Sequence, residues 1–262
     1  MVEVTFDQLQ TWLAMFLWPF ARIAAFIAAA PLLGHSSVPN QAKIGLAALM
    51  TVVIGATMPP MPEVPVMSWS GVGILAEQVL IGTAMGLAMQ VIFSVVQAAG
   101  EFIGFQMGLA FATFFAPDTG ANTMILSRLF HMLAMLMFLA LNGHLIMVEI
   151  VAGTFATLPV GVGGLQAGGF ELLVRFTGTI FVSGLLLALP LVAALLVINL
   201  SMGILNRAAP QFTVFSVGFP MSLTAGIFLL TVLMNDLGRF LQGLFSQGLQ
   251  FLQALVLALA GA

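Results

Sequence analysis

The charged side chains that could take part in chemistry are few, and they are spread through long apolar stretches. The 262 residues include nine acidic residues, six basic residues and three histidines. Glu171 and Arg175 are spaced i,i+4, and Asp236 and Arg239 are spaced i,i+3, so each pair lies on one face of a helix. This spacing predicts a local ion pair at the end of a membrane-type helix in both cases.

Five further charged residues have no oppositely charged residue at helical spacing. They are Arg22, Glu77, Glu101, Arg128 and Glu149. A charge inside an apolar segment is costly unless it pairs or faces protein or water, so we expect such residues to meet between helices. A proton pathway would use the same residues. A proton-coupled small-solute transporter is therefore one interpretation of the sequence.

Catalytic and metal-binding motifs are not found. His144 and Glu149 are five residues apart and do not share a helical face, which is poor spacing for a metal site. The sequence has no Cys, so it offers neither thiolate ligands nor a Cys nucleophile. It also lacks a nucleophile elbow, a zinc-protease motif and a P-loop. We expect a protein that is not an enzyme and that carries no metal and no cofactor.

The composition is that of an integral membrane protein. Only 6% of the residues are charged and 61% are hydrophobic, whereas a soluble domain has about 25% charged residues. Six basic residues in a chain of net charge −3 cannot form a basic patch, so nucleic acid is excluded as a partner. The apolar runs are long and unbroken, not alternating, which favours helices over a barrel.

These runs predict an all-α polytopic fold with about six long hydrophobic helices and additional short or re-entrant ones. Four prolines within residues 59–65 exclude a helix there and mark a loop. No repeat of fixed period appears, so one domain over 1–262 is expected. The later uncharged or nearly uncharged stretches are 129–148, 150–170, 176–206, 212–235 and 240–262.

Glycines recur every four residues at Gly100, Gly104 and Gly108, and Gly82 and Gly86 repeat this spacing upstream. Small residues at this spacing let two helices approach closely. The partner helix is either another part of the same chain or a different subunit. The sequence leaves both possibilities open.

An apolar segment followed by turn-forming residues comes directly after these glycines. Its aromatic residues are Phe111, Phe114 and Phe115. Such rings can seal a pore by excluding water, or they can pack into the helix bundle or the lipid interface. Gly108, Pro117 and Gly120 bracket the segment with backbone that can bend.

Several stretches, in order and spacing, together resemble the FliR family, the flagellar biosynthesis R subunit of the type III secretion export gate. The resemblance covers nearly the whole chain. It is most specific in the Gly-Glu stretch and in the Arg-Ala-Ala-Pro-Gln stretch. The stretches that carry it are residues 100–112, 142–144, 158–159, 206–212 and 217–220.

The resemblance implies a non-enzymatic, multi-pass protein of the bacterial inner membrane, in the flagellar basal body. It implies assembly with P and Q subunits into a gate of tilted helical hairpins, with a B subunit at the entrance and membrane lipid around it. Unfolded flagellar proteins would pass through this gate. Residues 1–170 would resemble a P subunit, and residues 176–262 would form a hairpin that resembles a Q subunit.

The resemblance also places a pore plug in residues 108–123, so Phe111, Phe114 and Phe115 would close the channel. Gly108, Pro117 and Gly120 would be its hinges. Residues 207–212 would form a tight turn between the last two long helices. The alternative of a purely structural membrane scaffold predicts that the Phe segment tolerates charge. The residues expected in subunit packing are Gly100, Glu101, Gly104, Gln106, Met107, Arg207, Pro210 and Gln211.

Overall fold

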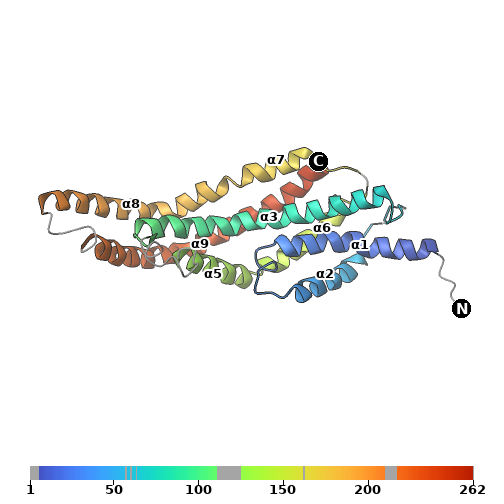
Figure 1. Cartoon of the computed structure of the whole chain (residues 1–262), viewed down its shortest axis with the longest axis horizontal. Helices are drawn as coiled ribbons and strands as arrows, with labels where there is room; N and C mark the ends of the chain where they lie inside the picture. Colours follow the sequence, from blue (N-terminus) through green and yellow to red (C-terminus); the bar gives the residue numbers. More distant parts are fainter. Residues whose placement is uncertain are drawn as a thin grey trace. The chain divides into compact units, whose positions relative to one another are not determined.

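The computed structural model describes residues 6–56, 58–59, 61–62, 64–110, 125–161, 163–209 and 217–261. Every regular element within these ranges is a helix (Figure 1), which confirms the all-α class. The helices are α1 (Phe6–Ala29), α2 (Asn40–Gly55), α3 (Trp69–Gln106), α5 (Ile125–Ala140), α6 (Gly143–Thr157), α7 (Ala167–Phe176), α8 (Thr179–Ala208) and α9 (Phe219–Ala260).

Within the described ranges, 4 helical stretches are long and apolar enough to cross a membrane. They are Gln8–Ala29, Trp69–Gln106, Ala167–Ala208 and Phe219–Ala260. The count rises to 5 if α5 and α6, which are bent by 69° relative to each other, are taken as one broken span. Helix α2 is apolar but shorter. The chain is polytopic as the sequence predicts, and in the described residues 4 or 5 possible spans compare with the roughly six long helices that the apolar runs predicted.

The difference in number arises because a surface ion pair does not end a helix. The sequence analysis separated 212–235 from 240–262, but α9 runs continuously from Phe219 to Ala260. Asp236 and Arg239 lie within it as an exposed pair with 3.9 Å between Oδ1 and Nη1. The second predicted pair, Glu171 and Arg175, is confirmed on α7 at 2.7 Å. Only this second pair lies at a helix end.

Glu149, which separates two uncharged stretches of the sequence, does not separate two helices. Glu149 lies in the middle of α6, and the break comes seven residues earlier, at Asn142. Asn142 adopts a left-handed conformation with φ 56° and ψ 22°, which Asn tolerates better than most residues because its short polar side chain bonds locally. A lone surface charge leaves the backbone hydrogen bonds of a helix intact, whereas a left-handed residue interrupts them. The proline-rich loop is confirmed in the described residues between α2 and α3.

The chain divides into two compact units, each assembled from separate pieces of sequence. Unit 1 contains Met1–Val91, Asn142–Thr177 and Gln247–Ala262, and unit 2 contains Ile92–Leu141 and Gly178–Ser246. The expected division near residue 170 separates a part that resembles a P subunit from a part that resembles a Q subunit. It does not refer to compact units of the fold. It stays a prediction.

In unit 1, two glycines of α3 bring that helix against α1. A Cβ atom added at Gly82 would overlap the backbone of Arg22, and one added at Gly86 would overlap Ala29. Large side chains fill the remaining core, including the fully buried Trp18 and Phe26 of α1. The glycine spacing upstream of Gly100 therefore serves packing within the chain.

Arg22 is completely buried in this core, at 0% exposure. Its Nε donates to Gln78 Oε1 at 2.7 Å, and its Nη1 donates to the carbonyl and hydroxyl oxygens of Thr154 at 3.2 and 3.1 Å. Its Nη2 donates to the carbonyl oxygen of Leu158 at 2.9 Å. The guanidinium carbon also lies 4.3 Å from the centre of the Phe155 ring.

The acceptors of Arg22 belong largely to the C-terminal end of α6, where the helix dipole is negative. Arg22 thus caps α6 from α1 and ties both helices to Gln78 of α3. The expectation that unpaired charges meet opposite charges between helices is wrong for Arg22. Within the described chain, its four hydrogen bonds go to neutral oxygens. The end of α6 and the amide of Gln78 supply these acceptors without a second charged residue.

The core of unit 2 is built from aromatic rings. Phe93 of α3, Phe138 of α5 and Phe245 of α9 lie with centroid separations of 5.0 to 5.8 Å. His131 of α5 stands edge-on to Phe93 at 5.9 Å. From this contact we infer that His131 takes part in the packing of the unit 2 core.

We expect Arg22→Leu to destabilise the chain strongly, because Gln78 Oε1, Thr154 Oγ1 and the carbonyl oxygen of Leu158 would lose the donor that Arg22 provides. The cost is about 1–3 kcal/mol for each buried acceptor left unpaired. The measurement is the temperature at which detergent-solubilised protein loses its monodisperse elution profile. Arg22→Lys should also destabilise, since an ammonium cannot reproduce the fork of the guanidinium.

Arg175→Leu is the matched control, because the Glu171–Arg175 pair is exposed and should contribute no more than about 1 kcal/mol. Equal losses for Arg22→Leu and Arg175→Leu would contradict the assigned role of Arg22.

Candidate functional site

The C-terminal end of α3 in unit 2 leads toward the segment predicted to plug a pore. Gly108 has φ 80°, a conformation that favours glycine. The N–H of Leu109 donates to the carbonyl of Gly104 at 2.9 Å, and the N–H of Gly108 donates to that of Phe105 at 3.0 Å. These two bonds form a Schellman motif that ends the helix. Gly108 is thus a helix-terminating glycine, and its role as a hinge stays a prediction.

Side chains from α8 and α9 fix this helix end. Asn199 Nδ2 donates to the carbonyl oxygen of Gln106 at 3.2 Å, and Ser222 Oγ donates to Asn199 Oδ1 at 2.6 Å. Asn199 thereby provides a donor to a carbonyl in the last turn of α3, where helix carbonyls need partners from outside the helix. The sequence analysis missed Asn199 and Ser222. In the sequence, Asn199 stands out only as an amide side chain inside the long uncharged stretch 176–206. Nothing in the sequence indicates which residue it bonds.

Two of the residues expected in subunit packing make close contacts within unit 2. Met107 is buried, and a Cβ atom added at Gly226 of α9 would lie only 2.6 Å from Met107 Cγ. A Cβ atom added at Gly100 would lie 2.6 Å from the Cα of Ser127 of α5. Internal packing therefore accounts for Gly100 and Met107. Contacts of this residue set with another subunit stay a prediction.

Four of the remaining residues that were predicted to act in subunit packing or in the plug lie within the described ranges, and seven do not. Gly104 is buried, Glu101 and Gln106 are half-buried, and Arg207 is exposed. Arg207 lies in the last turn of α8, where its charge favours the negative end of the helix dipole. The predicted residues outside the described ranges are Phe111, Phe114, Phe115, Pro117, Gly120, Pro210 and Gln211.

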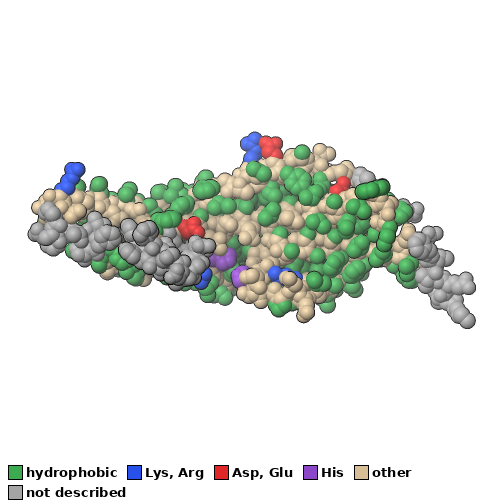
Figure 2. All heavy atoms as spheres, in the orientation of Figure 1, with side chains coloured by type: hydrophobic (Ala, Val, Ile, Leu, Met, Phe, Trp, Pro, Cys, Tyr) green, Lys and Arg blue, Asp and Glu red, His purple; other side chains and the backbone are tan. Residues whose placement is uncertain are grey.

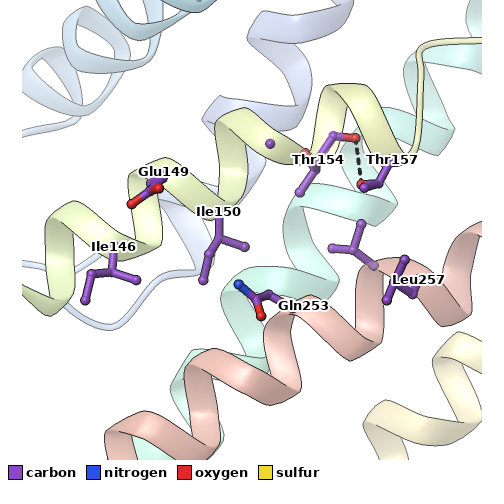
Figure 3. A pocket seen from close by; sticks show the side chains of 9 residues that line it. Ile146, Glu149, Ile150, Thr154, Thr157, Gln253 and Leu257 are labelled. Carbon is purple, nitrogen blue, oxygen red and sulfur yellow. Dashed lines mark hydrogen bonds between the residues drawn. The ribbon is translucent and has the colours of Figure 1, made fainter.

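A second candidate site lies in unit 1, between α6 and the C-terminal part of α9. A cavity of about 480 Å³ opens there (Figure 3). Ile150 of α6 and Leu257 of α9 point into the space between the helices, and the amide of Gln253 reaches from α9 toward α6. Glu149 stands on its α6 side. In the described residues, no group of three His, Asp or Glu side chains could hold a metal ion.

Much of the apolar surface of the long helices faces outward. Within the most apolar window of each span, 67% is buried for Trp69–Gln106. The buried share falls to 28% for Ala167–Ala208 and to 17% for Phe219–Ala260. Hydrophobic side chains are accordingly spread over the face shown in Figure 2. Surfaces of this kind require cover from lipid or from other proteins.

Comparison with known proteins gives a consistent result. The family described as bacterial export proteins, family 1, matches residues 13–248. The flagellar biosynthetic protein FliR of Escherichia coli K12 is 44% identical over 94% of this chain and 94% of its own. FliR of Pectobacterium carotovorum is 44% identical over 90% of both chains, and FliR of Bacillus subtilis 168 is 29% identical over 94% of this chain and 95% of its own.

The matched residues 13–248 include the buried Arg22, the glycines of α3, the end of α3 at Gly108, and Glu149 of α6. Identity of 44% over almost the full length of both chains leaves no separate region to carry a different fold. The chain therefore belongs to the family of bacterial export proteins that includes the flagellar biosynthetic protein FliR.

Proposed function

We propose that this chain is a membrane-embedded component of the flagellar protein export apparatus. The observation that carries the proposal is the 44% identity to FliR of Escherichia coli over 94% of both chains. The apolar helices long enough to cross a membrane support an embedded position. The transporter interpretation rested on dispersed charges alone, and the most buried of them, Arg22, is engaged in a structural cap.

Within that apparatus, the chain is a subunit of the export gate. It forms, with P and Q subunits, the channel through which unfolded flagellar proteins cross the inner membrane, and a B subunit acts at the entrance. The outward-facing apolar side chains support assembly with neighbours. Phe181 of α8 and Phe228 of α9 are each 69% exposed, and residues of this kind are stabilised by packing against other helices or lipid.

Residues 108–123 contain the plug of this channel. A channel wide enough for a polypeptide must be closed at rest, because ions would otherwise dissipate the proton gradient. The rings of Phe111, Phe114 and Phe115 can exclude water without strong polar bonds, so the closure can still yield to a passing chain. The anchoring of Gln106 and Met107 supports this role, since it gives the segment a fixed starting point.

We expect deletion of the gene to abolish export of flagellar hook and filament proteins, and the cloned chain to restore it. The tagged chain purified in mild detergent should bring other export components with it. The loss of export follows from the proposed role in the apparatus, and the co-purification follows because the exposed apolar surface favours cover by neighbouring subunits. The measurements are immunoblots of the culture medium and mass spectrometry of the purified material. Normal export in the deletion strain, together with a stable monomer that binds no export component, would contradict the proposal.

We expect replacement of Phe111, Phe114 and Phe115 by Ser to raise ion conductance through the assembled gate and to slow growth. Each buried Phe contributes about 1.5–3 kcal/mol of burial energy, so losing three should open the closure. The measurement is membrane conductance in cells that produce the gate, after purification has verified assembly.

Phe105→Ser is the matched control for the plug. Phe105 is 58% exposed and precedes the helix-terminating Gly108, so its loss removes a ring of the same size outside the plug. Wild-type tightness in the triple variant would place the seal on another part of the gate.

A further inference from the structure

One carboxylate of unit 1 has no partner in the described chain. Glu149 is the single Asp, Glu, Lys or Arg of α6 and its side chain is exposed. No hydrogen bond or ion pair joins it to another described residue, whereas the exposed Glu171 lies 2.7 Å from Arg175. A lone carboxylate on an apolar helix is expensive once lipid or protein covers that helix. Cover by the export apparatus therefore favours a neighbouring cation, unless this carboxylate stays in water or takes up a proton.

The surroundings of Glu149 favour cover by protein. The cavity of about 480 Å³ beside it has mainly apolar walls, from Ile146, Ile150 and Leu257. Its size falls within the range of ordinary binding pockets, about 300–1,000 Å³. Gln253 adds one amide, which can both donate and accept a hydrogen bond (Figure 3). We call this surface, with Glu149 and Gly153, the α6–α9 groove.

Gly153 leaves space on α6 for the backbone of a second helix. It lies one turn after Glu149, is exposed, and also lines the cavity. A Cβ atom added there would meet nothing within 4 Å, so packing inside the chain does not require glycine at this position. Glycine in a helix interior is unfavourable, but it allows the backbone of a second helix to approach closely.

We propose that the α6–α9 groove docks a helix of another export component that carries a Lys or Arg within one turn of a bulky apolar side chain. The cation pairs with Glu149, and the apolar side chain fills the space between Ile150 and Leu257. The neighbouring backbone passes over Gly153. This inference rests on the proposed function, which supplies the assembly in which the partner is found.

Charge complementarity selects this occupant over others. A lipid acyl chain would fill the apolar walls but would leave Glu149 without a cation. An unfolded substrate of varied sequence would not present one cation at a fixed distance from one apolar side chain. A helix that bears both groups satisfies the carboxylate and the cavity at once.

The absence of Cys from the sequence permits a site-specific test. Gly153→Cys introduces a single thiol at a position with free space, and benzophenone-4-maleimide can be attached to it in membranes that contain the whole apparatus. Motility of cells carrying Gly153→Cys establishes that the variant assembles. We expect illumination to join this chain to one other export component, at a helix with Lys or Arg within four residues of Leu, Ile, Phe or Met.

Four outcomes would overturn the proposal. They are adducts with lipid alone, with an exported protein, with a second copy of this chain, or with a helix that has no basic residue. The absence of any protein adduct from a motile strain would also overturn it.

Charge reversal then tests the ion pair. Glu149→Lys should reduce recovery of the cross-linked partner by at least about tenfold, because two cations would face each other. Replacing the partner's basic residue by Glu should restore recovery. Glu149→Gln, which keeps the shape, should lie between wild type and Glu149→Lys. Glu171→Gln is the matched control and should leave recovery unchanged, since its carboxylate is already paired with Arg175.

The two proposals fail in different ways. If the wild-type chain binds no export component, the proposed function fails. If the wild-type chain binds them and Glu149→Lys binds them equally well, the docking inference alone is overturned.

Discussion

The hydrogen bonds of Arg22 are the interaction on which unit 1 depends. A guanidinium with no exposed surface joins α1 to Gln78 of α3 and to the last turn of α6. Its charge is balanced by the negative end of the α6 dipole and by the face of Phe155, not by a carboxylate. Leaving a buried acceptor without a donor costs more free energy than one hydrogen bond contributes. Arrangements of the three helices that break these bonds are therefore disfavoured.

The same contact supports the groove on the other side of α6. Thr154 accepts hydrogen bonds from Arg22 and also lines the cavity beside Glu149. Leu158, where α6 ends, is held by Arg22, and the following loop is tied to α9 by the bond from Gln166 N–H to the carbonyl of Leu259 at 3.2 Å. The walls of the α6–α9 groove are therefore positioned in part by a charge that is itself completely buried.

The sequence predicted the features that depend on composition or on local spacing. Low charge and long apolar runs gave the helical membrane class, and i,i+3 and i,i+4 spacing gave the ion pairs at Asp236 and Glu171. The partners of Arg22 were not predictable, because two of its acceptors are backbone carbonyls and the other two, on Gln78 and Thr154, lie 56 and 132 residues away in the sequence. The bond between Ser222 and Asn199 joins separate helices, so no helical period could reveal it. Glycine spacing indicated which helix faces allow close approach, but not which helix packs against them. Gly100 packs against Ser127 of the same chain.

The distribution of polar groups separates what the chain satisfies by itself from what it leaves to its neighbours. Arg22, Asn199 and the Glu171–Arg175 pair all find partners inside the chain. Among the described residues, the apolar faces of α8 and α9 are largely uncovered and the carboxylate of Glu149 has no partner. Anything that covers such surfaces stabilises the folded chain by mass action. The internal polar contacts fix the arrangement of the helices, and cover of the remaining apolar faces by lipid or protein adds to the stability of the folded chain.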